Sequence, residues 1–470
     1  MENKASKYTM ALVVLTSLFF MWGFITVTND ILVNTFKEIF SLSPTQRSLV
    51  QMAFFGAFFI VSIIYFIVSS LSGKDPINKI GYSNGMIISL LVCGIGCLSF
   101  YPAALLNSYL AFLVALFVLA IGVTLLQICS NPYAAILGSP ESSSSRLNLA
   151  QGFNSLGTTI GPLIGVLLIY QIFSNGERTP ESVGKTYLIY GCAFIVCAIL
   201  VKFSKMPSFV NTEKIEPGFK VLKNRHLALG MIAIFFYVGS EVSIGTWLVE
   251  FLKDKNIGGL SEENASYFLS YFWGGLMIGR LMASISLNDS ISKTKKYLSM
   301  LVVSLAVFGF IYIVTGIRYE NQTFILQLLD FKTVSIYLIF MVVNFMAFIL
   351  GSGKPARSLM VFCTINLILI LSAMLSSGQY SMWAIIGTGL FFSIGWSNIF
   401  TLAIRDLGKY TSQGSSLLVM AIVGGAVLPR IQSEIIEGHS IQLSFIIPLL
   451  GMVYLIFYGW KGHLIKKKGF

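Results

Sequence analysis

Long apolar runs separated by short polar connections extend from Tyr8 to Trp460. Each run is about 18 residues or longer, which is enough for an α-helix to cross the hydrocarbon core of a bilayer. The pattern predicts fourteen membrane-spanning helices, near residues 8–36, 48–72, 80–102, 108–138, 147–174, 185–204, 227–250, 264–288, 297–316, 334–353, 357–376, 380–404, 413–436 and 441–461. We therefore expect an all-α polytopic membrane protein.

The longest polar connection lies near the middle of the chain, at residues 205–225, and it is rich in lysine. We expect an N-terminal six-helix bundle over 1–204, a cytoplasmic basic linker over 205–225 and a C-terminal bundle over 226–470. Six spans, a basic central loop and further spans are the arrangement of a transporter built from two related halves.

Composition agrees with a chain embedded in lipid, because 55% of its residues are hydrophobic, 11% are charged and the mean hydropathy is +0.79. The net charge of +12 could suggest nucleic acid. However, most of the lysines and arginines fall in alternate connections, on one side of the predicted membrane, and this bias marks the cytoplasmic side. We therefore expect a bacterial inner-membrane protein with both termini in the cytoplasm and no nucleic-acid partner.

The sequence contains few residue patterns that could form a catalytic, metal-binding or nucleotide-binding site. Its six cysteines lie inside apolar runs without a CxxC pair, and it has three histidines. The GxxxxGK[ST] pattern of a phosphate-binding loop does not occur. We expect no cofactor, no metal site and no enzymatic activity, so that transport would be driven by the gradient of an ion or of the solute itself.

Asp30 is the leading candidate for ion coupling, because an acid inside a membrane span costs about 2.5–3.5 kcal/mol on insertion scales and needs a reason to be there. It follows Asn29 late in the first span. An acid in a partly dry cavity can take up and release a proton as its exposure changes. The alternative is that Asp30 lies near the outer interface and is only solvated there.

Amides recur at helical spacing in the fourth and fifth spans. Gln127 and Asn131 are four residues apart, and the adjacent Pro132 frees the carbonyl of Ile128. The fifth span continues the series with Asn148, Gln151, Ser155 and Thr158. Amides can both donate to and accept from sugar hydroxyls. A single amide usually joins two helices, whereas several aligned amides favour the wall of a cavity, and both interpretations stay open.

A second polar group lies in the seventh and twelfth spans. Tyr237 and Glu241 share a helix face, which offers a ring to stack on a sugar and an acceptor for its hydroxyls. A polar clamp between helices is the alternative. Trp396 and Asn398 lie among serines and threonines in an otherwise apolar span, where stacking on a pyranose ring and simple packing are both open.

Four residues are expected to shape the helices or their movement rather than bind a solute. Gly157 and Gly424 lie in stretches of small residues that let helices pack closely and slide. Pro132 is expected to kink its helix. Arg280, toward the inner end of its span, is expected to gate or cap there.

Pairs of short motifs spread along nearly the whole chain match a known pattern. They are Trp22-Gly23 with Asn29-Asp30, Asn131-Pro132-Tyr133 with Leu137-Gly138, residues 146–151 with 153–157, Tyr237-Val238-Gly239 with 241–245, and 412–415 with 420–426. In these motifs the chain resembles the fucose/glucose–galactose permease family of major facilitators. The resemblance implies the major facilitator fold of two six-helix bundles, and sugar–proton symport by alternating access.

The resemblance also implies roles for particular residues. Asp30 matches the family's first-span acid, which links protonation to sugar binding. Gln127 stands where fucose permeases carry a second acid, and the glucose–galactose branch tends to be amidic there, so a neutral hexose such as glucose or galactose is implied. Val27 stands where fucose permeases have a polar residue. Fucose or an N-acetylhexosamine as the sugar, sodium in place of the proton, and export of a drug or metabolite remain the alternatives.

The family usually has twelve spans, so the run at about 296–353 is expected to be an extra helix pair, inserted after the eighth span and packed at the periphery. The expected substrate-binding residues are Asn29, Gln127, Asn131, Asn148, Gln151, Asn154, Tyr237, Glu241, Trp396 and Asn398. The chain is expected to act as a monomer, with the sugar, the proton or sodium, and the lipid bilayer as its partners.

Overall fold

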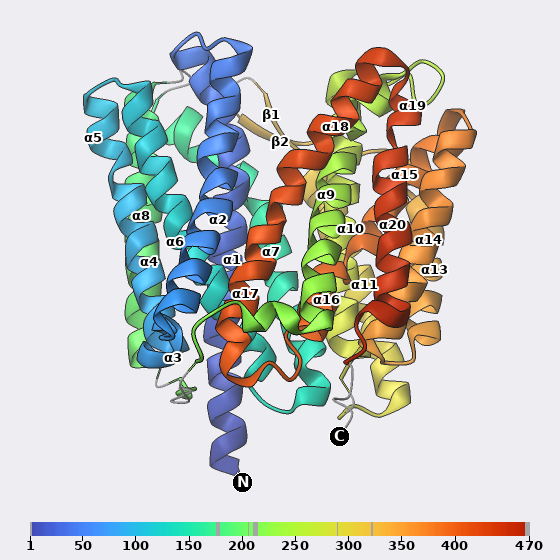
Figure 1. The fold of residues 1–470 in the computed structure, drawn as a ribbon. Coiled ribbons are helices and arrows are strands. Elements are labelled where there is room, and N and C mark those ends of the chain that lie inside the picture. Colours follow the sequence, from blue (N-terminus) through green and yellow to red (C-terminus); the bar gives the residue numbers. More distant parts are fainter. Residues whose placement is uncertain are drawn as a thin grey trace. The chain divides into compact units, whose positions relative to one another are not determined.

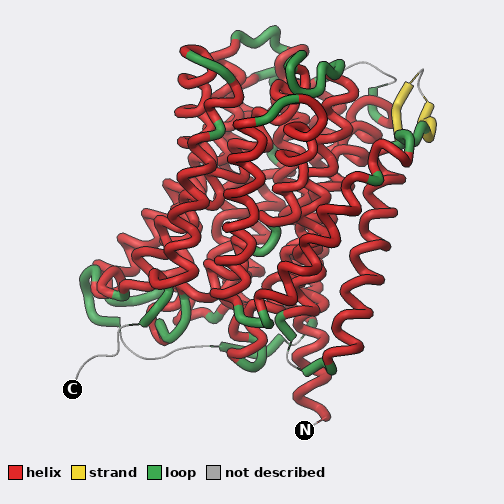
Figure 2. Tube along the Cα trace, turned by 90° about the vertical axis from the view of Figure 1, so that its right-hand side faces the viewer, coloured by secondary structure: helices red, strands yellow, loops and turns green. Residues whose placement is uncertain are grey.

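The computed structural model describes residues 2–174, 179–204, 206–209, 215–288, 290–320 and 323–465. Within these ranges, fourteen helices are long and apolar enough to cross a membrane, and helix dominates the chain (Figure 2). The predicted number of spans and the helical class are therefore confirmed.

The spans of the first half follow the predicted order (Figure 1). They are α1 (Glu2–Ile39), α2 (Pro44–Ser72), α4 and α5 (Tyr82–Leu98 and Phe100–Leu105), α6 (Tyr109–Ile136), α7 (Ser143–Val166, continued as π-helix over Leu167–Ile172) and α8 (Pro180–Phe203). A short helix, α3 (Pro76–Ile80), follows α2.

The second half contains more breaks. Its helices are α9 (Arg225–Lys253), α10 (Glu262–Ser286), α11 (Lys293–Thr315), α12 (Phe331–Val334), α13 (Ile336–Gly351), α14 (Pro355–Leu375), α15 (Gly378–Phe392), α16 (Gly395–Ala403), α17 (Thr411–Met420), α18 (Gly424–Gly438), α19 (Ile441–Ser444) and α20 (Ile446–Phe457). Short 3₁₀ turns occupy Pro140–Ser142, Lys220–Lys223, Gly408–Tyr410 and Ala421–Val423, and Tyr458–Gly462 is π-helical.

Local sequence explains where several helices begin. Ser43 and Gln46 exchange hydrogen bonds between side chain and backbone at the start of α2, and Thr179 and Ser182 do the same at the start of α8. Such capping boxes satisfy backbone N–H groups that have no partner in the first turn. Gly73 ends α2 in the left-handed region, at a φ of 62°, which a residue without Cβ adopts readily.

The predicted extra pair is present as α11 and α13. α11 packs on α10, and α13 packs on α14 and α15. The connection between them contains an antiparallel hairpin, β1 (Ile317–Glu320) with β2 (Thr323–Leu326). The described chain is thus helical apart from this one small hairpin, which is too short to be distinguished from a loop by hydropathy.

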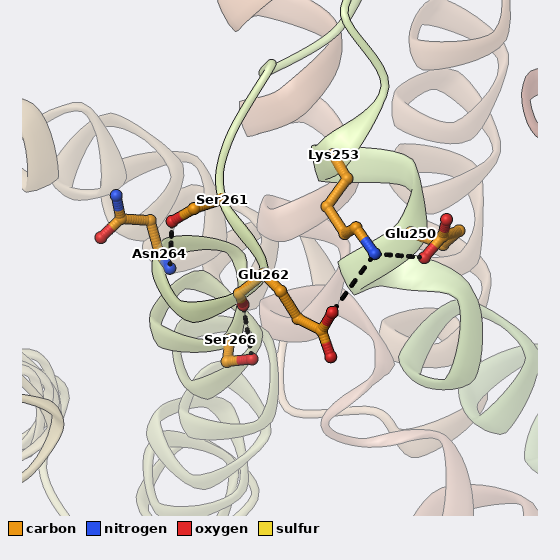
Figure 3. A network of polar contacts seen from close by, with 6 residues as sticks. All are labelled: Glu250, Lys253, Ser261, Glu262, Asn264 and Ser266. Atoms are coloured by element: carbon orange, nitrogen blue, oxygen red, sulfur yellow. Dashed lines mark hydrogen bonds and ion pairs between the residues drawn. The ribbon is translucent and has the colours of Figure 1, made fainter.

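The turn between α9 and α10 carries a polar network (Figure 3). Lys253 Nζ lies 3.1 Å from Glu250 and 3.4 Å from Glu262. Ser261 caps α10 by accepting a hydrogen bond from the N–H of Asn264 (3.3 Å). These side chains are largely exposed, and exposed ion pairs contribute about 0–1 kcal/mol. The network orders the turn but contributes little to stability.

The chain forms two compact units. The first comprises Met1–Ser139, Leu156–Val221 and Asp406–Met420, and the second comprises Pro140–Ser155, Leu222–Arg405 and Ala421–Phe470. The expected division into 1–204 and 226–470 therefore differs at two segments, the start of α7 and the segment that contains α17.

Hydrogen bonds explain both differences. At the start of α7, Ser144 bonds to Thr401 (2.6 Å) and Ser145 donates to the carbonyl of Ser284 (2.6 Å), both in the second unit. In α17, Gln413 donates to Ser69 of α2 (2.7 Å) in the first unit. The spans α7 and α17–α18 thus each run from one unit into the other.

The described part of the expected linker, as far as Val221, packs on the first unit. Tyr133 of α6 donates to the carbonyl of Pro207 (3.0 Å), and the N–H of Gly218 donates to the carbonyl of Ser70 (2.8 Å). The ring of Phe219 lies 5.7 Å from that of Phe66. Residues 205 and 210–214 of the linker lie outside the described residues. The described residues up to Val221 thus contact the first unit at these points, whereas residues 222–225 belong to the second unit.

Asp75, between α2 and α3, is buried and organises this end of the first unit. Its carboxylate accepts five hydrogen bonds, from the hydroxyls of Tyr65 (2.7 Å), Ser69 (3.2 Å) and Ser412 (2.6 Å) and from the N–H groups of Ile77 (2.9 Å) and Asn78 (3.1 Å). A buried carboxylate is stabilised only when such donors replace water. Asp75 thereby joins α2, α3 and α17.

Asp75→Ala should lower the unfolding temperature in detergent by several degrees, because it leaves buried donors without their acceptor, at a cost of about 3 kcal/mol. The matched control is Asp330→Ala, which removes an exposed capping aspartate that bonds to Lys332 and Thr333. Thermal unfolding followed by fluorescence measures both variants. Equal unfolding temperatures for the two would contradict the role given to Asp75.

Candidate functional site

The first unit holds three of the predicted binding amides, on α1 and α6. Asn29 donates to Gln51 of α2 (2.9 Å), and Asn131 donates to the carbonyl of Gln127 (3.0 Å). Within the described chain, Asn29 Oδ1 and Gln127 Nε2 are buried and have no hydrogen-bond partner. Such groups are costly unless a ligand or water satisfies them. Asp30 lies in α1, but its side chain falls outside the described residues, so its role stays a prediction.

Pro132 lies inside α6, and the carbonyl of Ile128, which it was predicted to free, has its partner in another helix. Proline has no N–H with which to bond the carbonyl of Ile128. Ser415 of α17 donates to that carbonyl instead, at 3.1 Å. Sequence reasoning identified the free carbonyl but missed the donor, which lies 287 residues further along the chain.

The amides at the start of α7 divide into two groups. Asn148 is fully buried and donates to the carbonyl of Ser144 (2.8 Å) and to Asn398 Oδ1 (3.3 Å). Asn398 in turn donates to the carbonyl of Pro355 (3.2 Å). These bonds join helices within the second unit, so at Asn148 and Asn398 they support the helix-packing interpretation.

Gln151 and Asn154 are also buried. Ser155 lies one turn after Gln151, and its hydroxyl accepts a hydrogen bond from Arg280 Nη1 (2.7 Å). Residues four apart share a helix face, so the Gln151 face of α7 is turned toward α10. Gly152 packs against Leu281 in the same contact.

Glu241 and Arg280 form a charged group in the second unit, beside Tyr237. Arg280 is buried and its guanidinium interacts electrostatically with Glu241. Glu241 is half-buried, and its Oε2 has no hydrogen-bond partner within the described chain. Glu241 is thus an acceptor with spare capacity, held near a cation.

The side chain of Tyr237 contacts the protein backbone, in place of the sugar-stacking role that was one of two expected for it. Its hydroxyl donates to the carbonyl of Phe392 (3.0 Å), and its ring lies directly against Gly395. Arg280 Nε donates to the carbonyl of Ser393 (3.3 Å). Both side chains therefore support the break between α15 and α16. The gating or capping role expected of Arg280 stays a prediction, and for Tyr237 this contact favours the clamp alternative.

Trp396 follows this break and is nearly buried. Its ring stacks on Phe400, with a centroid separation of 5.9 Å and an interplanar angle of 28°. An indole held in this way can still present its other face to a ligand. Stacking on a sugar and plain packing both remain compatible with these contacts.

The two predicted small-residue positions are points of close helix contact. A Cβ on Gly157 would meet the backbone of Phe20 in α1, and a Cβ on Gly424 would meet the backbone of Phe235 in α9. Close packing at both sites is therefore seen, while movement at them stays a prediction.

Sequence reasoning missed two buried asparagines, Asn344 in α13 and Asn366 in α14, that contact α15. Each is a polar residue in an otherwise apolar run, which was the available signal. A single amide inside a span generally indicates a hydrogen bond to some other helix, and nothing in the sequence indicated which helix that would be.

The second unit thus offers an unsatisfied carboxylate oxygen, a guanidinium, an amide and an indole, and the first unit offers unsatisfied amide groups. Such groups suit a neutral ligand with many hydroxyls, because acceptors, donors and an apolar face are all available. Within the described residues, no group of three or more His, Cys, Asp or Glu could hold a metal ion.

Comparison with known proteins places these features in a family. Residues 10–352 match the family model described as Major Facilitator Superfamily. The chain is 38% identical to a protein of Brucella abortus biovar 1 (strain 9-941) named glucose/galactose transporter, over 98% of this chain and 96% of that protein. It is 25% identical to the L-fucose-proton symporter of Escherichia coli (strain K12), over 95% of this chain and 92% of that one.

The fold agrees with these matches. A crystal structure of the major facilitator transporter FucP in the outward conformation aligns with a TM-score of 0.74 at 24% identity, covering 97% of this chain and 99% of that one. A family model that covers most of the chain and a relative similar along nearly its full length are sufficient to assign the family. The chain belongs to the Major Facilitator Superfamily.

Proposed function

We propose that this chain is a secondary transporter that imports a neutral hexose, of the glucose or galactose kind, together with a proton. The observation that carries the proposal is the similarity, over 98% of the chain, to a protein named glucose/galactose transporter. Similarity to an L-fucose-proton symporter supports the coupling to a proton. The carrier works in a bacterial cytoplasmic membrane as a monomer, with both termini in the cytoplasm, and it is not an enzyme.

The polar groups of the site support a neutral sugar rather than a charged or apolar solute. Glu241 provides an acceptor for sugar hydroxyls, and its charge is balanced within the protein by Arg280. Within the second unit the amide of Gln151 adds donors and an acceptor without adding charge, and the first unit offers the amide of Gln127. A site for a broad range of apolar drugs would not need these buried polar groups, because each costs free energy when it has no partner.

Proton coupling is assigned to Asp30, as the acid of the first span. An acid that is protonated when the site faces outside and loses its proton inside would couple sugar entry to the proton gradient. Glu241 has Arg280 as a neighbouring cation, so it is given the role of a sugar acceptor. The two acids thereby have separate and testable functions.

Purified protein in sealed vesicles should accumulate glucose or galactose when an inward proton gradient is imposed. A panel of labelled sugars, including fucose and N-acetylglucosamine, with proton and sodium gradients applied separately, measures both the substrate and the coupling ion. Accumulation driven by sodium alone would replace the proton in the proposal. Efflux of drugs without any sugar uptake would contradict it.

Asp30→Asn should abolish accumulation against a gradient while sparing exchange of labelled for unlabelled sugar, because exchange needs no net proton movement. The matched control is Glu241→Gln, which keeps the shape of the other acid. It should raise the half-saturating sugar concentration about tenfold or more in both assays, since a charged hydrogen bond is worth about 1.5–3 kcal/mol. If Asp30→Asn still concentrates sugar, the coupling residue is misassigned.

A further inference from the structure

The span over 378–403 is interrupted although it lies in the interior of the second unit. α15 ends at Phe392 and α16 begins at Gly395, and the most apolar window of this span is entirely buried. The last carbonyls of a helix have no partner in their own helix. Since neither lipid nor protein interior supplies water, other side chains must donate to these carbonyls.

Four helices supply the donors. The carbonyl of Leu390 accepts from Asn344 of α13 (3.0 Å), that of Phe392 from Tyr237 of α9 (3.0 Å) and that of Ser393 from Arg280 of α10 (3.3 Å). The carbonyl of Thr388 accepts from Asn366 of α14 (3.1 Å) in the amide orientation that gives both groups of this side chain a partner. Leu390 also accepts from the hydroxyl of Ser393, at 2.7 Å. The end of α15 is therefore fixed from several directions by hydrogen bonds.

One of the four donors comes from the inserted helix pair. α13 buries one face, made of Tyr337, Met341, Asn344, Ala347 and Phe348. Residues at this spacing lie along one side of a helix. Its other side is apolar and exposed, as expected of a surface that faces lipid. The side chain of Asn344 is thus the amide that α13 turns into the protein.

Glycines let α13 approach closely enough for Asn344 to reach its acceptor. A Cβ on Gly275 of α10 would meet the hydroxyl of Tyr337, and a Cβ on Gly387 of α15 would meet the ring of Phe340. The Tyr337 hydroxyl also donates to the carbonyl of Tyr271 in α10 (2.9 Å). These contacts fix how far α13 is inserted and how it is rotated.

We propose that Asn344 is a positioning residue, through which the inserted pair α11–α13 sets the position of α16 and of Trp396 upon it. Its amide holds the carbonyl of Leu390, two residues before α15 ends, and α16 begins directly after the break. The inserted pair is therefore part of the support of the site rather than a peripheral addition. The proposal rests on the proposed function only in that α16 contributes Trp396 to sugar binding.

Asn344→Leu tests the proposal, because it removes the amide at similar volume. The matched control is Gln432→Leu, which removes a buried hydrogen bond of the same unit, from α18 to Ser444 of α19 (2.9 Å), on helices that supply no donor to the break. In the full-length protein in detergent, Asn344→Leu should speed amide hydrogen exchange about threefold or more in peptides covering Leu390–Asn398. Gln432→Leu should leave exchange there unchanged, since interhelical bonds of this kind act locally.

Transport gives a second, independent readout. Asn344→Leu should raise the half-saturating hexose concentration about three- to tenfold, with a smaller change in maximal rate, while Gln432→Leu stays within about twofold of the wild type. If Asn344→Leu does not fold, Asn344→Ala replaces it in both measurements.

Unchanged exchange in Leu390–Asn398 would overturn the proposal, and so would equal effects of the two variants. If the wild-type protein carries no hexose, the proposed function fails, but the exchange measurement still decides whether Asn344 positions the break.

Discussion

The fold depends on the rule that every backbone carbonyl removed from water needs a donor within the protein. In unbroken helices the backbone meets this need by itself. Two of the places where a span loses regular helical bonding are Pro132 and the break between α15 and α16, and in both places side chains from other helices supply the donors. Irregular backbone in membrane carriers is tolerated where protein covers it or where it lines a cavity. Hydrogen bonds from side chains of distant helices thus offset the free-energy cost of each break.

This rule changes how the polar residues inside the spans are interpreted, because several of them donate to the backbone and are not free to bind a ligand. Tyr237 and Arg280 direct their donors at the break, and Asn148 and Asn398 bond to each other and to backbone. These side chains hold helices in place. Glu241 of the second unit keeps an oxygen without a hydrogen-bond partner among the described residues, and Gln151 and Trp396 are the other groups of that unit proposed to contact a ligand. A site with few ligating groups on a rigid frame is what selective binding of a small neutral solute requires.

Hydropathy and motif spacing were sufficient to predict the fourteen spans, the inserted pair and the family, because the length of an apolar run and the residues of a motif are local properties. They could not predict that Ser415 would satisfy Ile128 or that Asn344 would reach Leu390. Such pairings depend on how distant helices meet, and one sequence contains no record of that. For the same reason the exchange of the α7 and α17 segments between the units was missed. The hairpin after α11 was missed because its strands are four residues long.

The central claim is that the segment after the break contributes to sugar binding through Trp396. The chain has six tryptophans, so the other five can be replaced by phenylalanine to leave Trp396 as the sole reporter. Its fluorescence should then change saturably with glucose or galactose and not with mannitol, a linear polyol of similar size. Emission that does not respond to any hexose accumulated by vesicles containing the same protein would contradict the account.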